Sequence, residues 1–88
     1  MYDSKETLEK IRALLVPAFG EQVSLDDQSR FHVGHRAAGG GGHFFAEIRS
    51  DKFNGLSPLA RQRLVLEVVK PLMDREIHAF TMKCLPLE

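Results

Sequence analysis

The sequence predicts a small α+β domain in which a three-stranded mixed sheet carries its helices on one face. Apolar residues recur at helical spacing in two stretches and alternate with polar residues in three others, in the order helix, strand, strand, helix, strand. The chain has 88 residues, of which 43% are hydrophobic, so it forms one domain with one modest core. A chain this small has nothing else to cover the apolar face of its sheet, and both helices are therefore expected on that face.

The first helix is predicted to begin after Asp3 or Ser4 and to end near Val16. Glu6 follows Asp3 at the spacing of a capping box. A proline ring clashes with the preceding helical turn, so Pro17 is expected to end the regular helix. The apolar face of this helix comprises Leu8, Ile11, Leu15 and Phe19.

The first two strands are predicted at residues 22–27 and 43–49. Val23 and Leu25 alternate with polar residues and face the core from the first strand. We expect the two strands to form an antiparallel pair joined by residues 28–42, and loops of this length in small domains are often functional. The apolar side of the second strand comprises Phe44, Ala46 and Ile48.

The second helix is predicted from clear signals at both ends. Ser57 is a good N-cap residue, and Pro58 takes the first helical position, where its missing N–H costs nothing. Pro71 is expected to kink the helix or to end it around Lys70. The buried side of this helix is predicted to comprise Leu64, Val65, Val68, Val69, Leu72 and Met73.

The third strand is predicted at residues 77–84, with Phe80, Met82 and Cys84 on one side. Because a crossover helix separates it from the second strand, these two strands are expected to be parallel. Their N-terminal ends then lie together, which places His43 and His78 at one edge of the sheet. The predicted core comprises Ile11, Leu15, Phe44, Ile48, Leu64, Val68, Phe80 and Met82.

Charge and cysteine content argue against several classes of function. Twelve basic and twelve acidic residues give zero net charge, so no global field steers the chain toward nucleic acid or an anionic membrane. Cys84 is the single cysteine, which excludes an internal disulfide and suits a reducing compartment. The chain shows neither a signal peptide nor an apolar run of about 18 residues. We therefore expect a cytoplasmic protein, or a mitochondrial-matrix protein if a transit peptide has been removed.

Histidines are concentrated in one predicted loop. Three of the four, His32, His35 and His43, lie close to four consecutive glycines at residues 39–42. Such a glycine run holds neither helix nor strand, so the segment of about 28–42 is expected to be mobile. The loop therefore brings mobile imidazoles toward the edge of the sheet.

The histidine pattern favours a shared metal site over a self-contained one. A single histidine is most often a polar surface residue, and a structural zinc site needs four Cys or His ligands at recognisable spacings, which are absent here. A half-site completed by another molecule needs only two imidazoles. His78 at a strand start supplies the fixed one, and His32 or His35 in the loop supplies the mobile one.

Two other readings compete with a metal site. Arg61, Arg63 and Lys70 form a thin basic strip that could bind nucleic acid, but Glu67 balances it and a solvated helix face is the favoured interpretation. No serine, cysteine or paired carboxylate has a partner at a diagnostic catalytic spacing, so we expect no enzymatic activity. Cys84 is expected to be a small core residue instead of a nucleophile.

Six short stretches together resemble motifs of the BolA family and span residues 5–84. Each stretch is weakly diagnostic by itself, but their combination and order are specific. The stretches are Asp27-Gln28-Ser29, His32-Val33-Gly34-His35, His43-Phe44, Ser50-Asp51-Lys52-Phe53-Asn54-Gly55, Arg61-Gln62-Arg63-Leu64-Val65 and Ile77-His78-Ala79-Phe80.

The resemblance implies a KH-like fold of the second class and a partnership with a monothiol glutaredoxin. In such heterodimers a 2Fe–2S cluster is held by the glutaredoxin cysteine, by glutathione and by histidines of the BolA-like protein. His78 matches one of these ligands directly, and His35 matches the loop ligand, with His32 as the alternate. The isolated protein is then expected to be a monomer without a cluster. Some relatives are described as transcriptional regulators, so the alternative function is that of a KH-like nucleic-acid-binding regulator.

Overall fold

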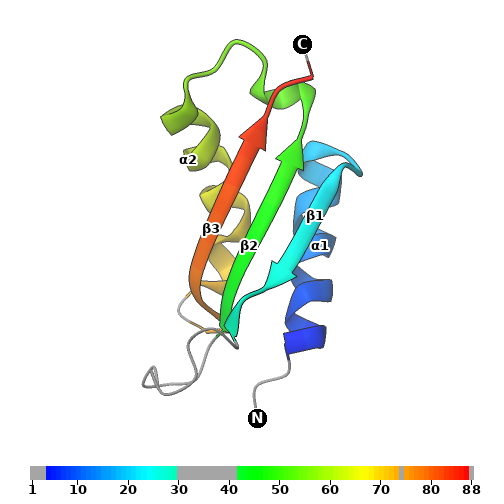
Figure 1. Cartoon of the computed structure of the whole chain (residues 1–88), viewed down its shortest axis with the longest axis vertical. Coiled ribbons are helices and arrows are strands. Elements are labelled where there is room, and N and C mark those ends of the chain that lie inside the picture. Colours follow the sequence, from blue (N-terminus) through cyan, green and yellow to red (C-terminus); the bar gives the residue numbers. More distant parts are fainter. Residues whose placement is uncertain (1–3, 30–41, 74, 88) are drawn as a thin grey trace.

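Two helices and three strands follow one another in the predicted order (Figure 1). The computed structural model describes residues 4–29, 42–73 and 75–87. The helices are α1 (Ser4–Phe19) and α2 (Pro58–Val69), and the strands are β1 (Val23–Asp27), β2 (Gly42–Arg49) and β3 (Ile77–Leu85). Two short 3-10 turns, η2 (Asp51–Phe53) and η3 (Lys70–Leu72), flank α2.

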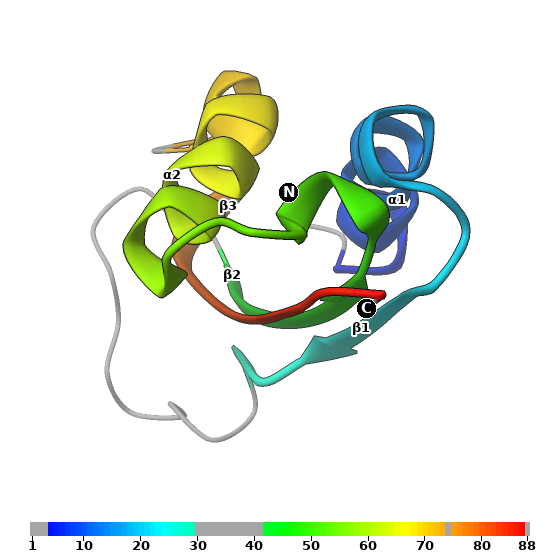
Figure 2. The same ribbon diagram turned by 90° about the horizontal axis from the view of Figure 1, so that it is seen from above.

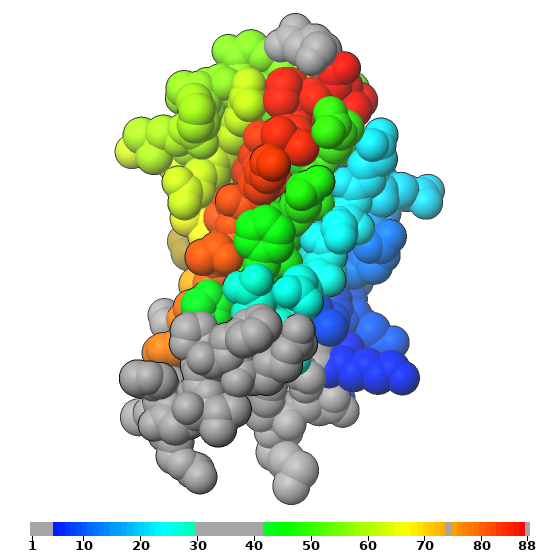
Figure 3. Space-filling model, viewed as in Figure 1, coloured from blue at the N-terminus to red at the C-terminus, as the bar shows by residue number. Residues whose placement is uncertain are grey.

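The sheet has the predicted mixed topology. Its strand order is β1-β2-β3, with β1 antiparallel to β2 and β2 parallel to β3. Both helices lie on the same face of the sheet, as Figure 2 shows, while Figure 3 views the opposite, open face. The predicted α+β class and element order are therefore confirmed, and the N-terminal ends of β2 and β3 lie side by side.

The core lies between the helices and the sheet. Its central residues Ile11, Leu15, Phe44 and Ile48 are fully buried, as predicted. The remaining buried hydrophobic residues are Phe19, Val23, Ala46, Phe53, Val65, Val69, Leu72 and Ile77. Alternation along β2 thus places its apolar side against the helices.

The prediction that Leu64 belongs to this core is wrong. Val65 and Val69 stand one helical turn apart and both face the sheet, so the helix turns Leu64 about 100° aside. Its side chain is 41% exposed. Three other predicted members, Val68, Phe80 and Met82, are only partly buried and pack against the margin of the core. The prediction was therefore correct for the centre of the core and included residues that lie at its margin.

The first helix runs further than predicted. It continues through Pro17 to Phe19 and stops at Gly20, whose φ of 101° only glycine adopts readily. Pro17 is exposed and lies in the last turn of the helix, so its missing N–H costs only one hydrogen bond near the helix end. Gly20 N donates to Val16 O at 2.8 Å. Phe19 is buried and its ring centroid lies 5.1 Å from that of Phe53. This contact stabilises the last turn of α1, so the predicted end of the helix near Val16 is three residues too early.

The second helix begins and ends where its flanking residues predict. Ser57 Oγ accepts a hydrogen bond from Ala60 N at 3.1 Å, and Pro58 occupies the first turn. The regular helix ends at Val69, after which Pro71 lies within η3. The predicted stop around Lys70 is confirmed.

Candidate metal-ligand site

His78 lies at the start of β3 and is exposed, as predicted. Its strand neighbour β2 begins at Gly42, directly opposite Ile77. Within the described residues no group bonds to the imidazole of His78. The imidazole is therefore exposed. The N-terminal ends of the parallel strands β2 and β3 lie side by side at this end of the sheet (Figure 1).

A β-bulge accounts for the exposure of His78. Gly42 is opposite Ile77, but the next residue, His43, is opposite Ala79, so His78 has no residue facing it. Ile77 is fully buried and Phe80 packs against the same core, although residues three apart on a regular strand point to opposite faces. One extra residue must be accommodated between them, and it is His78.

His43 lies beside this bulge and is partly buried. Its backbone joins it to the end of β1: Gln28 N donates to His43 O at 2.8 Å, and His43 N donates to Ser29 Oγ at 3.0 Å. Asp27 Oδ1 accepts from Ser29 N at 2.9 Å, which makes an Asx turn. The Asp-x-Ser motif thus closes the base of the predicted loop and fixes the position of His43.

The predicted loop ligands lie outside the described residues. His35 and its alternate His32 fall within residues 30–41, as does most of the predicted mobile loop. Within the described ranges, no group of three or more His, Cys, Asp or Glu residues could hold a metal ion. In the part of the chain that the structure describes, the candidate site therefore consists of one exposed imidazole, with His43 beside it.

Cys84 lies far along β3 from this edge. It is partly buried against the core, and burial raises the pKa of its thiol above the usual value of 9.0, an effect that the charge of Arg61 partly offsets. A thiol with a raised pKa is protonated at neutral pH, whereas metal ligands and nucleophiles are thiolates. The structure agrees with the expectation of a core residue.

The basic strip is not a row of three free cations. Arg61 donates from a terminal guanidinium nitrogen to Cys84 O at 3.4 Å, and its Nε is buried without a partner among the described residues. Arg63 and Lys70 are exposed. Because Arg61 packs at the junction of α2 and β3, it is poorly placed to neutralise a phosphate.

An open hollow of about 320 Å³ lies at the other end of the sheet. Two of its lining residues, Glu47 and Arg49, lie near the C-terminal end of β2, whereas His43 lies at the N-terminal end of the same strand. The hollow is lined by Glu21, Gln22, Val23, Ser24, Glu47 and Arg49. Ser24 is the one hydroxyl-bearing residue of this lining, and no histidine, lysine or cysteine stands beside it there, so the described lining does not form a recognisable catalytic set.

Three comparisons with known proteins identify relatives of this chain. A family model described as BolA-like protein matches residues 6–88. A curated protein from Sinorhizobium sp., described as an uncharacterized protein in the cobS 5′ region, is 33% identical over 82 residues. The match covers 89% of this chain and 85% of that protein. No helix in the described ranges is both long and apolar enough to span a membrane.

Solved structures with the same fold are similar over most of their length. A bol-like protein from Babesia bovis is 34% identical, with a TM-score of 0.72 over 90% of this chain and 83% of that one. The BolA domain of SufE1 from Arabidopsis thaliana is 26% identical, with a TM-score of 0.80 over 99% of this chain and 96% of that one. Both similarities therefore extend over a whole domain.

Proposed function

Because this chain belongs to the BolA-like protein family, we propose that it is a non-enzymatic partner of a monothiol glutaredoxin. The two proteins share a bridging 2Fe–2S cluster, which the glutaredoxin holds through its cysteine and glutathione. His78 of this chain supplies one imidazole, and His35 supplies the other, with His32 as the alternate. The complex serves cluster assembly and trafficking or iron sensing in a reducing compartment.

The exposure of His78 is the observation that carries the proposal. His78 is unpaired at the bulge, but the residues on both sides of it, Ile77 and Ala79, pair with β2, so the backbone that carries the imidazole is held on both sides. Its ring is exposed to a partner. Imidazole is a suitable ligand for iron, and the donor chemistry at this edge therefore fits the cluster.

The donors of the described residues fit a shared site better than a private one. Cys84 is the only cysteine, and burial raises the pKa of its thiol further above neutral pH, so the thiol stays protonated there. Clusters with four protein thiolates are thus unavailable to this chain alone. A partner that brings thiolates supplies what this chain lacks.

The cluster, when bound, supplies one-electron chemistry and can be passed on as cargo. The contribution of this chain is to replace thiolates on one side by neutral imidazoles. That replacement raises the reduction potential, as in other iron–sulfur centres with two histidine ligands. It also makes the bound state dependent on imidazoles that must be deprotonated at the ligating nitrogen.

A mixing experiment tests the proposal. The protein is combined with a cluster-loaded monothiol glutaredoxin and glutathione, and visible absorption and circular dichroism are recorded. We expect a heterodimer whose spectrum differs from that of the glutaredoxin homodimer, and we expect His78→Ala to abolish the new spectrum. Lys83→Ala is the matched control, because Lys83 is exposed on the same strand and lies away from the bulge. An unchanged spectrum in the His78→Ala protein would contradict the proposal.

The same experiment identifies the loop ligand. His35→Ala is expected to weaken or alter the new spectrum. If His32→Ala removes the spectrum and His35→Ala is silent, the cluster is shared as proposed and His32 is the ligand. If neither change has an effect, this chain supplies no ligand from that segment.

A further inference from the structure

We propose that Lys10 is a positioning residue for His78, acting through an ion pair with Glu76 at the start of β3. The inference rests on the proposed function, because it concerns how this chain presents its cluster ligand. It adds a residue of α1 to a site that otherwise belongs to the sheet edge.

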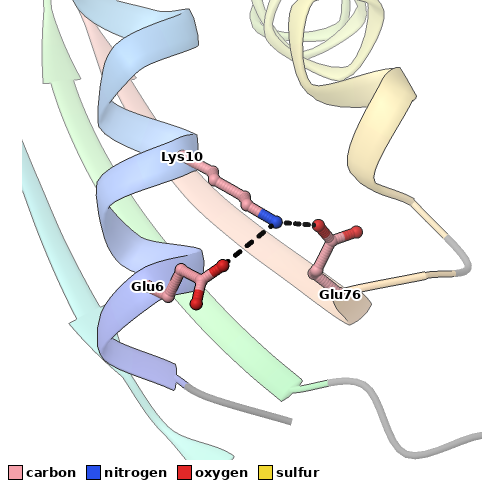
Figure 4. A network of polar contacts seen from close by, with 3 residues as sticks. All are labelled: Glu6, Lys10 and Glu76. Atoms are coloured by element: carbon pink, nitrogen blue, oxygen red, sulfur yellow. Dashed lines mark hydrogen bonds and ion pairs between the residues drawn. The ribbon is translucent and has the colours of Figure 1, made fainter. Parts of the chain in front are cut away.

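The ion pair joins two segments that are far apart in the sequence. Lys10 Nζ lies 2.7 Å from Glu76 Oε2, a short charge-assisted hydrogen bond. The same ammonium group lies 3.6 Å from Glu6 Oε1, one helical turn earlier on α1. Figure 4 shows Lys10 extending from α1 toward Glu76, with Glu6 beside it. The lysine is thereby held at its own helix and at the start of β3.

Glu76 is fixed through its backbone as well as through its side chain. Its carbonyl oxygen accepts a hydrogen bond from Gly42 N at 3.0 Å, the first bond between β2 and the segment that enters β3. Glu76 therefore links α1, through Lys10, to the first residue of β2. His78 follows two residues later, immediately after the buried Ile77.

A bulge needs such an anchor more than a regular strand does. The extra residue is left out of the ladder, so neighbouring strand hydrogen bonds fix it less firmly. Ile77, which directly precedes the bulge, is held by core packing. The peptide before it is held by the hydrogen bond from Gly42 N to Glu76 O. Ligand sites work only when their supporting contacts hold the ligand to within about half an ångström. Removing the charge of Lys10 should therefore loosen the imidazole without removing it.

The test has a readout that needs no cluster. In Lys10→Met the aliphatic stem remains and the charge is lost, so we expect faster amide exchange at Gly42, which donates to Glu76 O. The amide of Ile48, at the far end of β2, should keep its wild-type exchange and serves as the internal reference for global stability. Glu76→Gln removes the same ion pair from its other side and should give the same pattern.

The second readout is the lifetime of the shared cluster. Changing outer partners of metal ligands costs about 10- to 100-fold in metal affinity, and Lys10 acts one step further away. We therefore expect roughly 3- to 10-fold faster loss of the cluster spectrum from the heterodimer in Lys10→Met and in Glu76→Gln. Lys10→Arg retains the charge and should restore both readouts. Lys52→Met is the matched control, since Lys52 is exposed in η2.

The outcomes separate this inference from the proposed function. Wild-type exchange at Gly42 in Lys10→Met overturns the anchoring role, whatever the cluster does. Faster exchange at Gly42 with an unchanged cluster lifetime, in a protein whose His78→Ala variant loses the spectrum, overturns positioning and leaves the proposed function standing. A His78→Ala variant that keeps the spectrum overturns the proposed function and the ligand-positioning role together, and the Gly42 readout then reports the structural anchor alone.

Discussion

His78 is exposed because the core needs the residues on both sides of it. Ile77 and Phe80 both pack toward the helices, and this requires one more residue between them than regular alternation allows. That residue is His78, which the register leaves without an opposite partner on β2. Placement of an exposed imidazole at the bulge thus follows from the apolar packing beside it.

At the residue scale, Cys84 should react slowly with alkylating reagents. Burial raises the pKa of its thiol above 9.0, so little thiolate is present at pH 8 and access is reduced. The folded protein should therefore react more slowly with iodoacetamide than the same protein in urea, which is the matched control. The raised pKa contributes to stability below about pH 9, and this contribution is lost as the pH rises through the folded value. Equal rates in the folded and unfolded protein would contradict this account.

The position of His78 could be predicted from the sequence, but the β-bulge that exposes it could not. It predicts that His78 lies exposed at a strand start beside His43, because a parallel crossover brings those two strand ends together. It does not predict the bulge, since only the paired register shows that Ile77 and Phe80 share a face. A signal was available in the three-residue spacing of these two apolar residues. The Asp-x-Ser turn could also have been predicted, because aspartate readily bonds the backbone two residues on.

At the scale of elements, α1 is joined to the start of β3 by a pair of exposed charges. The hydrogen bond from Lys10 lowers the pKa of Glu76 below 4.5, and the same bond raises the pKa of Lys10 above 10.5. Glu6 adds a weaker contact from the preceding turn of the helix. The pair is exposed and is therefore screened by salt, so it positions the segment more than it stabilises the fold.

The contribution of this pair should be confined to a window of pH. The lowered pKa of Glu76 means that its contribution is present above about pH 4.5 and is lost as the pH falls through the folded value. The raised pKa of Lys10 means that the contribution is complete below about pH 10.5 and is lost as the pH rises further. Thermal melting should thus distinguish Glu76→Gln from the wild type at pH 7, and the difference should shrink as the pH falls below about 4.5. A difference that persists undiminished at pH 3 would show that another interaction of Glu76 is responsible.

Element boundaries were predicted best where local chemistry sets them. Ser57 and Pro58 fix the start of α2 through a side-chain cap and a preset φ, and both signals are legible in the sequence. The end of α1 was predicted too early, because Phe19 packs against Phe53 and holds the turn that contains Pro17. A tertiary contact therefore outweighed a local preference.

At the scale of the whole molecule, the two helices and the sheet enclose one core, and its centre should dominate stability. Phe44 is fully buried, so Phe44→Ala should lower the free energy of unfolding by about 3–5 kcal/mol. Phe80 is only partly buried, so Phe80→Ala should lower the free energy of unfolding by an amount at or below the lower end of that range. Leu64→Ala, the matched control on the exposed side of α2, should change stability by no more than about 0.5 kcal/mol.

Urea denaturation of these three variants measures the ranking. A Leu64→Ala variant as unstable as Phe44→Ala would contradict the core described here.

The overall fold was predictable because strand alternation, helical periodicity and the rule for parallel crossovers all favour the same arrangement. The exposure of Leu64 was not predictable, because Leu64 and Val65 both fit an apolar helical face. Only packing against the sheet determines that Val65 is the buried one.

The measurement that tests the central claim most directly is nitrogen hyperfine spectroscopy of the shared cluster. The protein is labelled with ¹⁵N only in the imidazole rings of its histidines and combined with unlabelled cluster-loaded glutaredoxin and glutathione. The cluster is then reduced by one electron and examined by pulsed electron paramagnetic resonance. Any ¹⁵N coupling then comes from an imidazole of this chain. We predict a strong ¹⁵N coupling in the wild-type heterodimer and its loss or marked change in the His78→Ala variant. A spectrum without ¹⁵N coupling, or one that the His78→Ala change leaves intact, would contradict the assignment of His78 as a cluster ligand.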